Sequence, residues 1–191
     1  MYPFPRSEKP PEGEKPPSLR LFTAIAVPCA VSAGIRAVLA GYGELLGRLP
    51  ETLHLTLRFL GEVPEPLVQE LSQALRKAAG PPPPEIRLGP LGVFRRRGRS
   101  LLWAGLEPSG ALSALKGKID RALAGLPLPP PGKFTPHLTL ARLKPGGPRP
   151  PEHPEALRPG GSFTAESFGL YSSLLRPEGA LHSLLHEYPL K

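Results

Sequence analysis

The chain has 191 residues, enough for one domain with a buried core. Lys and Arg total 24 against 16 acidic residues, a formal net charge of +8 at pH 7. A basic surface attracts polyanions, most often nucleic acid, although solubility alone would also explain the charge. The single cysteine, Cys29, excludes an internal disulfide and a thiolate metal cluster. Neither a run of 18 apolar residues nor a signal-peptide core occurs, so we expect a soluble cytoplasmic protein.

The first half of the chain alternates strand-like and helix-like segments. Residues 1–18 are rich in Pro, Glu and Lys, which predicts a flexible tail, with one folded domain over residues 19–191. A strand is expected over 19–28, followed by a helix over about 31–46 that Gly41 and Gly43 weaken. The next strand contains the sequence HLTLRFLGE from His54, and a helix is expected over 66–79, with a proline near its start.

The second half repeats this alternation. Strands are expected over 85–91 and 100–106, a helix over about 110–124, and a strand from His137. Residues 145–160 hold many of the remaining Pro and Gly and predict an irregular connection. Residues 162–173 and 180–190 are each expected to form one closing strand. Strands interspersed with about three helices indicate an α+β chain.

The pattern T-x-H-L-T-L occurs twice, at residues 52–57 and 135–140. Apolar and polar residues alternate in both copies, as in a half-buried strand. Each strand would therefore present one imidazole and a neighbouring hydroxyl on one face, with its leucines toward a core. Two sheet histidines with β-favouring neighbours would explain a single copy, but a matched pair indicates a site.

This set of side chains suits acid–base chemistry on a phosphate. Histidine titrates near neutrality, with an unperturbed pKa of about 6.5, so one imidazole can be neutral while the other is protonated. Hydrolysis of a phosphodiester needs a base for water, an acid for the leaving oxygen, and donors for the developing charge. The two threonine hydroxyls are suitable donors to phosphate oxygens.

The chain resembles the bacterial and archaeal RNA 2′,3′-cyclic phosphodiesterases of the 2H phosphoesterase superfamily, which is named for two H-x-[ST]-x motifs. The similar segments are RLFTAIAVP at 20–28, HLTLRFLGEV at 54–63, GVFRRRGRSLLWAGL at 92–106, FTPHLTLAR at 134–142 and LYSSLLRPEGA at 170–180. The resemblance implies a bilobal α+β fold with pseudo-twofold symmetry, in which two antiparallel sheets face a central cleft and helices lie outside. It implies hydrolysis of RNA 2′,3′-cyclic phosphate ends to 2′-phosphomonoesters, without a metal or other cofactor. We also expect the protein to be a monomer.

Five residues take roles from the resemblance. His54 matches the proton donor that protonates the departing 3′ oxygen, and His137 matches the acceptor that activates water. Thr56 and Thr139 match phosphate-binding hydroxyls, and Arg142 matches a phosphate-contacting arginine. Because Arg142 lies five residues after His137, an ideal strand would turn it to the opposite face, so we expect a bulge or strand end near Ala141.

Other residues are candidates for RNA contacts. Arg58 has the same parity as His54, and is an additional phosphate contact or a strand-end surface charge. Arg95, Arg96, Arg97 and Arg99 form a cationic loop suited to the RNA backbone, or a solvated loop. Phe22, Trp103 and Tyr171 are candidates to stack on a terminal base, but core packing is the favoured alternative for all three, most strongly for Trp103.

His182 and His186 share a face of either a helix or a strand, but no further ligand lies nearby, so surface histidines are expected. Several functions remain open beside the phosphodiesterase. A 2′–5′ RNA ligase would run the reverse reaction, and a small cyclic nucleotide would be a different substrate. A non-catalytic RNA-binding protein would keep the fold alone, and a metallohydrolase would use His54 and His137 as ligands.

Overall fold

The computed structural model describes residues 16–41, 46–47, 49–50, 52–96, 99–143, 161–177 and 179–191. The strands are β1 (Ser18–Ala26), β2 (His54–Pro64), β3 (Glu85–Arg96), β4 (Arg99–Leu106), β5 (His137–Arg142), β6 (Ser162–Thr164), β7 (Ser167–Arg176) and β8 (Gly179–Pro189). The helices are α1 (Cys29–Ala40), α2 (Glu65–Arg76) and α3 (Gly110–Ala122). The predicted α+β class is confirmed.

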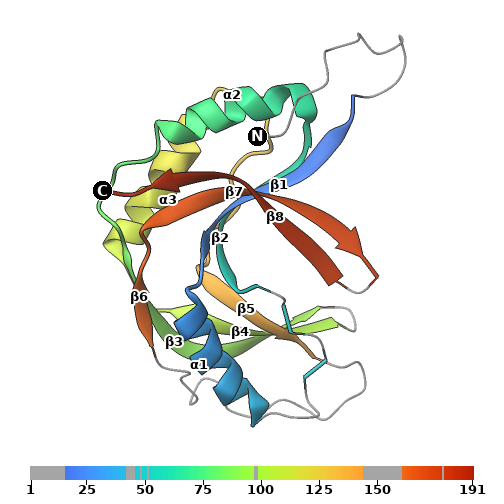
Figure 1. The fold of residues 1–191 in the computed structure, drawn as a ribbon, viewed down its shortest axis with the longest axis vertical. Coiled ribbons are helices and arrows are strands. Elements are labelled where there is room, and N and C mark those ends of the chain that lie inside the picture. Colours follow the sequence, from blue (N-terminus) through green and yellow to red (C-terminus); the bar gives the residue numbers. More distant parts are fainter. Residues whose placement is uncertain are drawn as a thin grey trace.

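The described strands pair in one sheet of eight strands, in the order β6-β3-β4-β5-β2-β1-β7-β8. The pairs are antiparallel, and β2 meets β5 in the middle through a single bridged pair within the described residues, Leu55 with Leu138. Four strands lie on either side of this bridge. The sheet therefore bends sharply at its centre, and its two halves diverge from there (Figure 1).

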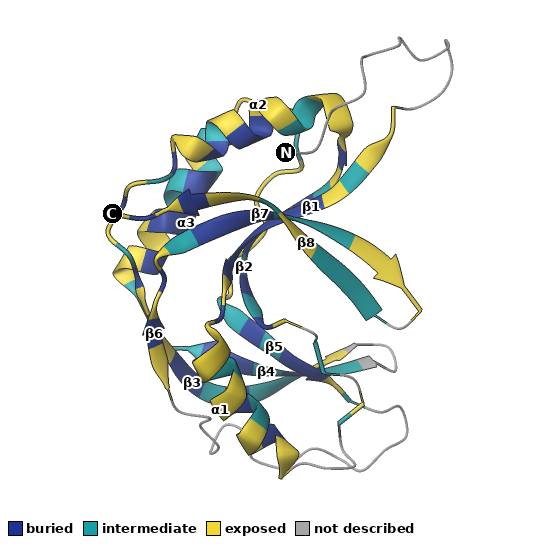
Figure 2. Cartoon of the chain, in the orientation of Figure 1, coloured by how far each residue is buried: buried dark blue, intermediate teal, exposed yellow. Residues whose placement is uncertain are grey.

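The helices lie outside the two halves of the sheet (Figure 1). α2 contacts β2 and β8, and α3 contacts β2 and β3. The core forms where the leucines of β2 and β5 meet apolar residues of the helices, such as Leu71, Leu115 and Ile35. Burial is greatest at the centre of the sheet, whereas the ends of β7 and β8 that form a hairpin are more exposed (Figure 2).

Two helices have different bounds from those predicted. α1 ends at Ala40, because Gly41 follows it as the C-cap and glycine is unfavourable inside a helix. α2 runs from Glu65 to Arg76 with a proline in its first turn, one residue earlier than expected. The prolines at 81–84 follow it before β3 begins.

Several strands also differ from the prediction. Ser18 pairs with Pro64 in β1 and therefore does not belong to the tail, of which residues 1–15 lie outside the described residues. The segment 162–173 contains two strands rather than one. β6 pairs with β3, whereas β7 pairs with β1, so the chain passes between the two halves of the sheet at residues 165–166. The expected irregular connection over 145–160 lies outside the described residues.

Candidate active site

The two T-x-H-L-T-L segments meet at the centre of the sheet. The antiparallel bridge between Leu55 and Leu138 places Thr56 opposite His137 and His54 opposite Thr139, because neighbours of a bridged pair face each other. Both leucines are fully buried, and the four polar side chains are half-buried on the opposite face. We call this the inner face. The predicted strands and their alternation are confirmed.

The two motif strands carry the same bulge. β2 gains one residue against β1 between Thr56 and Arg58, and β5 gains one residue against β4 between Thr139 and Ala141. A bulge reverses the parity of the residues that follow it. The residue five positions after each histidine, Phe59 in β2 and Arg142 in β5, therefore returns to the inner face. The bulge expected near Ala141 is confirmed.

Arg58 lies on the other face, which corrects the prediction that it shares a face with His54. The bulge turns its side chain toward α3, where it is 6% exposed. Its guanidinium forms an ion pair with Asp120 at 3.3 Å and donates to the carbonyl of Pro129 at 3.0 Å. Lys116 pairs with the same carboxylate. Arg58 therefore joins β2 to α3, and no surface remains for an RNA contact.

His137 is held by the backbone two residues before it. Its Nδ1 donates to the carbonyl of Thr135 at 2.8 Å. Because a carbonyl can only accept, this bond places the ring proton on Nδ1 and leaves the lone pair on Nε2. The rings of Phe94 and Trp103 contact the imidazole nearly at right angles, with centroids 5.3 and 6.2 Å away. A neutral imidazole held in this way can accept a proton at Nε2.

His54 has the matching backbone contact, a hydrogen bond to Thr52 that raises its pKa. Burial has the larger, opposite effect and lowers the pKa from 6.5 to about 4, and repulsion from His182 and His137 acts in the same direction as burial. Below the imidazole lies Phe22, with ring centroids 5.1 Å apart. In the free protein His54 is therefore neutral at pH 7.

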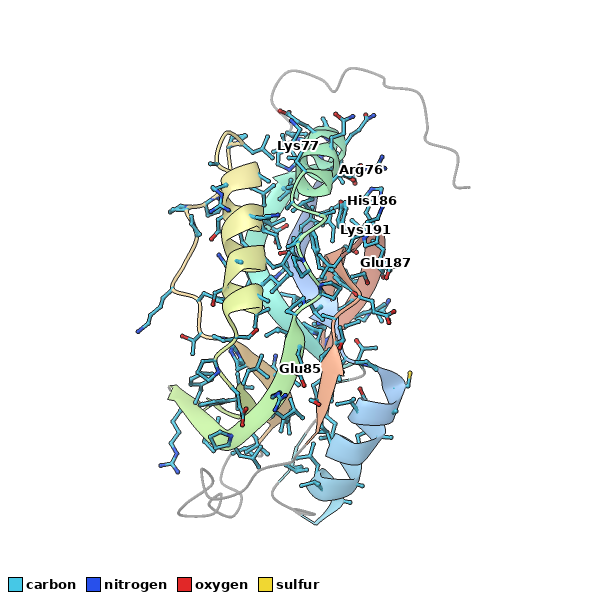
Figure 3. The ribbon with its side chains drawn as sticks, turned by 90° about the vertical axis from the view of Figure 1, so that its left-hand side faces the viewer. Arg76, Lys77, Glu85, His186, Glu187 and Lys191 are labelled. Atoms are coloured by element: carbon cyan, nitrogen blue, oxygen red, sulfur yellow. The ribbon has the colours of Figure 1, made fainter. Side chains whose placement is uncertain are left out.

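His182 corrects two sequence predictions. It is half-buried rather than on the surface, and its ring centroid lies 5.0 Å from that of His54. The expectation that His182 and His186 share a face is also wrong, because β8 has a bulge against β7 between Leu184 and His186. His186 is exposed as predicted, and Figure 3 shows it on the α2 side of β8, near Arg76.

The aromatic candidates are placed differently from one another. Phe22 is 1% exposed, beneath His54, Tyr171 and His182, so it supports the site and offers no surface to a base. Tyr171 stacks on Phe22 at 5.4 Å and is half-buried. Trp103 is also half-buried and lies against Gly92, where a Cβ would come within 2.2 Å of its ring. Only a glycine at position 92 allows this placement.

Sequence reasoning missed three residues of the inner face. Phe59 is 62% exposed there, because the bulge reverses its parity. Phe94 is 41% exposed and stacks on Trp103 with centroids 4.9 Å apart. His182 is the third. The T-x-H-L-T-L repeat contained a signal for Phe59, since Phe59 and Arg142 occupy the same position in the two copies.

An open groove of about 640 Å³ adjoins His137. It runs between the strand segment that contains Trp103 and the segment 134–136 that leads into β5. Its largest lining side chains are apolar: Pro90, Trp103, Leu106, Leu112, Phe134 and Pro136.

The cationic loop lies at the turn between β3 and β4. Arg95 is exposed, and the backbones of Arg96 and Arg99 pair at the end of the hairpin. Arg97 and the side chains of Arg96 and Arg99 lie outside the described residues.

In the described part of the chain, no three His, Cys, Asp or Glu side chains gather as metal ligands. None of the helices in that part has the length and apolar character that a membrane span requires.

Comparison with known proteins gives one consistent family. The RNA 2′,3′-cyclic phosphodiesterase of Thermus thermophilus is 33% identical over 184 residues, which cover 91% of each chain. The crystal structure of E. coli LigT complexed with phosphate matches with a TM-score of 0.73 and 27% identity, over 91% of this chain and 98% of that one. The LigT complex with 3′-AMP matches with a TM-score of 0.74 and 25% identity, over 91% and 99%. The family model of the 2′-5′ RNA ligase superfamily matches residues 27–176. The chain belongs to the 2′-5′ RNA ligase superfamily, and its predicted likeness to the RNA 2′,3′-cyclic phosphodiesterases is confirmed.

Proposed function

We propose that this protein hydrolyses RNA 2′,3′-cyclic phosphate ends to 2′-phosphomonoesters. The observation that carries the proposal is the central bridge of the sheet, which brings two backbone-anchored imidazoles and two hydroxyls to one face. The name of the Thermus thermophilus relative supports this substrate. The phosphate and 3′-AMP of the two LigT complexes are parts of such a substrate.

In the proposed reaction His137 is the base. Its Nε2 carries the lone pair, since Nδ1 donates to Thr135, and it takes a proton from water as the water oxygen attacks phosphorus. The bond between phosphorus and the 3′ oxygen breaks, and His54 donates a proton to that oxygen. The products are a 2′-phosphomonoester and a 3′-hydroxyl, and the two histidines exchange their protons with solvent afterwards.

The donor role of His54 requires a change on substrate binding. Burial keeps its pKa at about 4, so the free protein holds it neutral at pH 7. A bound phosphodiester carries one negative charge, and a nearby anion favours the imidazolium form. The substrate therefore brings the charge that stabilises its own proton donor.

We assign the phosphate oxygens to Thr56, Thr139 and Arg142. The register across the bridge sets each threonine opposite a histidine, which supports a role for the hydroxyls as donors to non-bridging oxygens. The bulge of β5 turns Arg142 to the same face, and its backbone carbonyl accepts a hydrogen bond from Gly47 at 2.7 Å. A guanidinium there would neutralise charge that develops on the phosphate.

We assign the terminal nucleoside to aromatic side chains of the inner face. Tyr171 on one side, and Trp103 with Phe94 on the other, offer ring surfaces near the two histidines. Stacking on rings binds single-stranded ends with little preference for sequence. We propose that the halves of the sheet act as two lobes, between which the RNA end binds.

The direct test is incubation with an RNA that ends in a 2′,3′-cyclic phosphate, with and without EDTA. We expect a 2′-phosphomonoester in both cases, identified by chromatography against the 3′ isomer. A 3′-phosphomonoester, or activity that requires added Zn²⁺ or Mn²⁺ after chelation, would contradict the mechanism. A second RNA with a 5′-hydroxyl, added in excess, shows whether the protein also forms a 2′–5′ linkage.

A further inference from the structure

The carbonyl that anchors His137 belongs to a segment with little support from the main chain. Thr135 lies within residues 129–136, which form neither a helix nor a strand, and half of these residues are prolines without an N–H donor. Within the described residues, no hydrogen bond between backbone groups joins this segment to a neighbouring element. The first motif differs, because Val27 donates to the carbonyl of Leu53 at 3.1 Å and so secures the chain before His54.

Side chains from β2 and α3 hold residues 129–136 instead. At one end of the segment, the guanidinium of Arg58 donates to the carbonyl of Pro129 at 3.0 Å. Near the other end, the Nζ of Lys116 lies over the ring of Phe134, 5.6 Å from its centroid. A cation at this distance is attracted by the face of an aromatic ring. Phe134 also packs against the core and immediately precedes Thr135.

The position of Lys116 is unusual for a lysine, because the residue is only 7% exposed. It pairs with Asp120 on the same helix, and Arg58 pairs with the same carboxylate at 3.3 Å. The contacts at Pro129 and Phe134 therefore come from one charged cluster. Burial of an ammonium costs free energy that a surface lysine would avoid, so solubility does not explain this placement.

We propose that Lys116 is a positioning residue of the active site. Through Phe134 it holds the carbonyl of Thr135, and this carbonyl fixes the tautomer and the orientation of His137. The inference deepens the proposed function and rests on it. The Nδ1 of His137 donates to that carbonyl at 2.8 Å, so Nε2 keeps its lone pair while the carbonyl stays within reach.

The groove beside His137 makes this support necessary. Residues 134–136 form one wall of the groove, and Gly110, Leu112 and Ser113 of α3 form another. Because the groove separates these two walls, packing against the first turn of α3 cannot hold the segment. The next turn of the helix carries Lys116, whose side chain reaches Phe134.

The first test is the tautomer of each motif histidine, measured by NMR of the ring nitrogens above neutral pH, where an ordinary imidazole is neutral. In the parent protein we expect His137 to carry its proton on Nδ1. Lys116→Met keeps a long side chain and removes the charge, and it should give a mixture of the two tautomers at His137. His54 should not change, because the backbone bond at Leu53 secures its own anchor.

The second test is hydrolysis of a mononucleotide cyclic phosphate. Lys116→Met should lower kcat roughly ten- to hundredfold and change KM little, because it displaces the base without removing a contact to substrate. Lys116→Arg keeps the charge and should retain most of the activity. Lys133→Met is the matched control, since this exposed lysine precedes Phe134 and its replacement removes the same charge. The control should change neither kcat nor the tautomer of His137.

A second variant tests the contact without disturbing the ion pairs of Asp120. Phe134→Leu keeps an apolar side chain and removes the ring, and it should reproduce the effects of Lys116→Met. If the two residues act through one contact, the double variant should lose no more kcat than either single variant.

An unchanged His137 tautomer in both single variants would overturn the proposal, and so would a changed tautomer with unchanged kcat. An equal loss of kcat in Lys133→Met would also overturn it, because net charge would then explain the effect. The tautomer measurement does not depend on catalysis. A parent protein that holds His137 as described but hydrolyses no cyclic phosphate would therefore refute the proposed function, whereas a parent protein with a mixed His137 tautomer would refute this inference.

Discussion

Each motif histidine is held and flanked by residues that lie immediately around it in the sequence. The carbonyl two residues earlier accepts from the ring, and the threonine two residues later stands beside the opposing histidine across the bridge. A six-residue segment therefore supplies the ring, its anchor and a hydroxyl. Two such segments on adjacent strands complete a site without any contribution from a loop.

The two histidines should be more important for turnover than the threonines. Replacement of His54 or His137 by Ala should reduce kcat by about two to four orders of magnitude, the usual contribution of general acid–base catalysis. Thr56→Ala or Thr139→Ala removes one neutral donor, worth roughly 1–3 kcal/mol when buried, and should reduce kcat less. Steady-state kinetics with a cyclic mononucleotide measure both. Near-normal turnover in either histidine variant would exclude the two-histidine mechanism.

Acid should destabilise the fold through His54. Burial lowers its pKa from 6.5 to about 4, so the unfolded chain takes up a proton there before the folded chain does. The folded state therefore keeps its full stability above pH 6.5 and loses part of it as the pH falls from 6.5 toward 4. We expect this group to account for on the order of 2–3 kcal/mol of that loss.

Urea denaturation at a series of pH values measures this effect. His54→Gln should show a smaller decrease in the free energy of unfolding between neutral and acidic pH than the parent protein. His186→Gln, which alters an exposed histidine, should behave as the parent does. Equal acid sensitivity in the parent and in His54→Gln would show that His54 is not the group responsible.

At the scale of elements, the bulges decide which arginine lies on the inner face and which packs against α3. Strand alternation alone predicts Arg58 on the same face as the histidines and Arg142 on the opposite face. One extra residue in each strand exchanges the faces of these two arginines. The outward side chain of β2 then meets α3 through Asp120, while the carbonyl of Pro129 accepts a second bond. This contact ties α3 and the loop before β5 to the back of the first motif.

Asp120 should therefore be a strong determinant of stability. Asp120→Ala leaves Arg58 and Lys116 buried without their shared carboxylate, and loss of one partner of a buried ion pair costs about 3–5 kcal/mol. Urea denaturation should show a loss of this size.

The matched pair Arg58→Met and Arg142→Met should separate stability from catalysis. Arg58→Met should lower the free energy of unfolding, and Arg142→Met should lower activity alone. The opposite pattern would reverse the two placements.

Periodicity predicted the motif strands and α2 well, because their apolar positions follow one period throughout. It could not predict a bulge, since one added residue leaves the composition unchanged and alters only the pairing. The same limit concealed His182, which the bulge of β8 separates from His186. The division of 162–173 into two strands was equally hidden, because it depends on which distant strand each piece pairs with.

At the scale of the molecule, one bridged pair joins two groups of four strands within the described residues. The sequence resemblance implied two facing sheets, whereas the strands form one sheet that bends at Leu55 and Leu138. A single bridge leaves the two halves free to diverge on either side of the histidines. The hairpin of β3 and β4 extends from one half and the hairpin of β7 and β8 from the other (Figure 1).

These two hairpins differ in chemistry. The β3–β4 turn carries the sequence Arg95-Arg96-Arg97-Gly98-Arg99, and the β7–β8 hairpin exposes Leu174 and Leu175. Contacts to RNA phosphates give an affinity that falls with salt, and in the proposed mechanism the reacting phosphate binds at the histidines. The arginine turn should therefore affect long RNA substrates and leave a mononucleotide unaffected.

Replacement of all four arginines of this turn by Gln should weaken binding of a single-stranded RNA and flatten the dependence of its affinity on salt. Each phosphate contact that is lost reduces the slope of log K against log salt by about 0.7. Hydrolysis of a mononucleotide cyclic phosphate should stay nearly unchanged, because no phosphate of that substrate reaches the turn.

A matched control replaces Arg76, Lys77, Arg20 and Lys191, which lie elsewhere on the surface, and removes the same charge. Equal loss of RNA affinity in this control would show that net charge, rather than the position of the arginines, draws RNA to the protein. Equal loss on both substrates in the arginine variant would place the turn within the catalytic site.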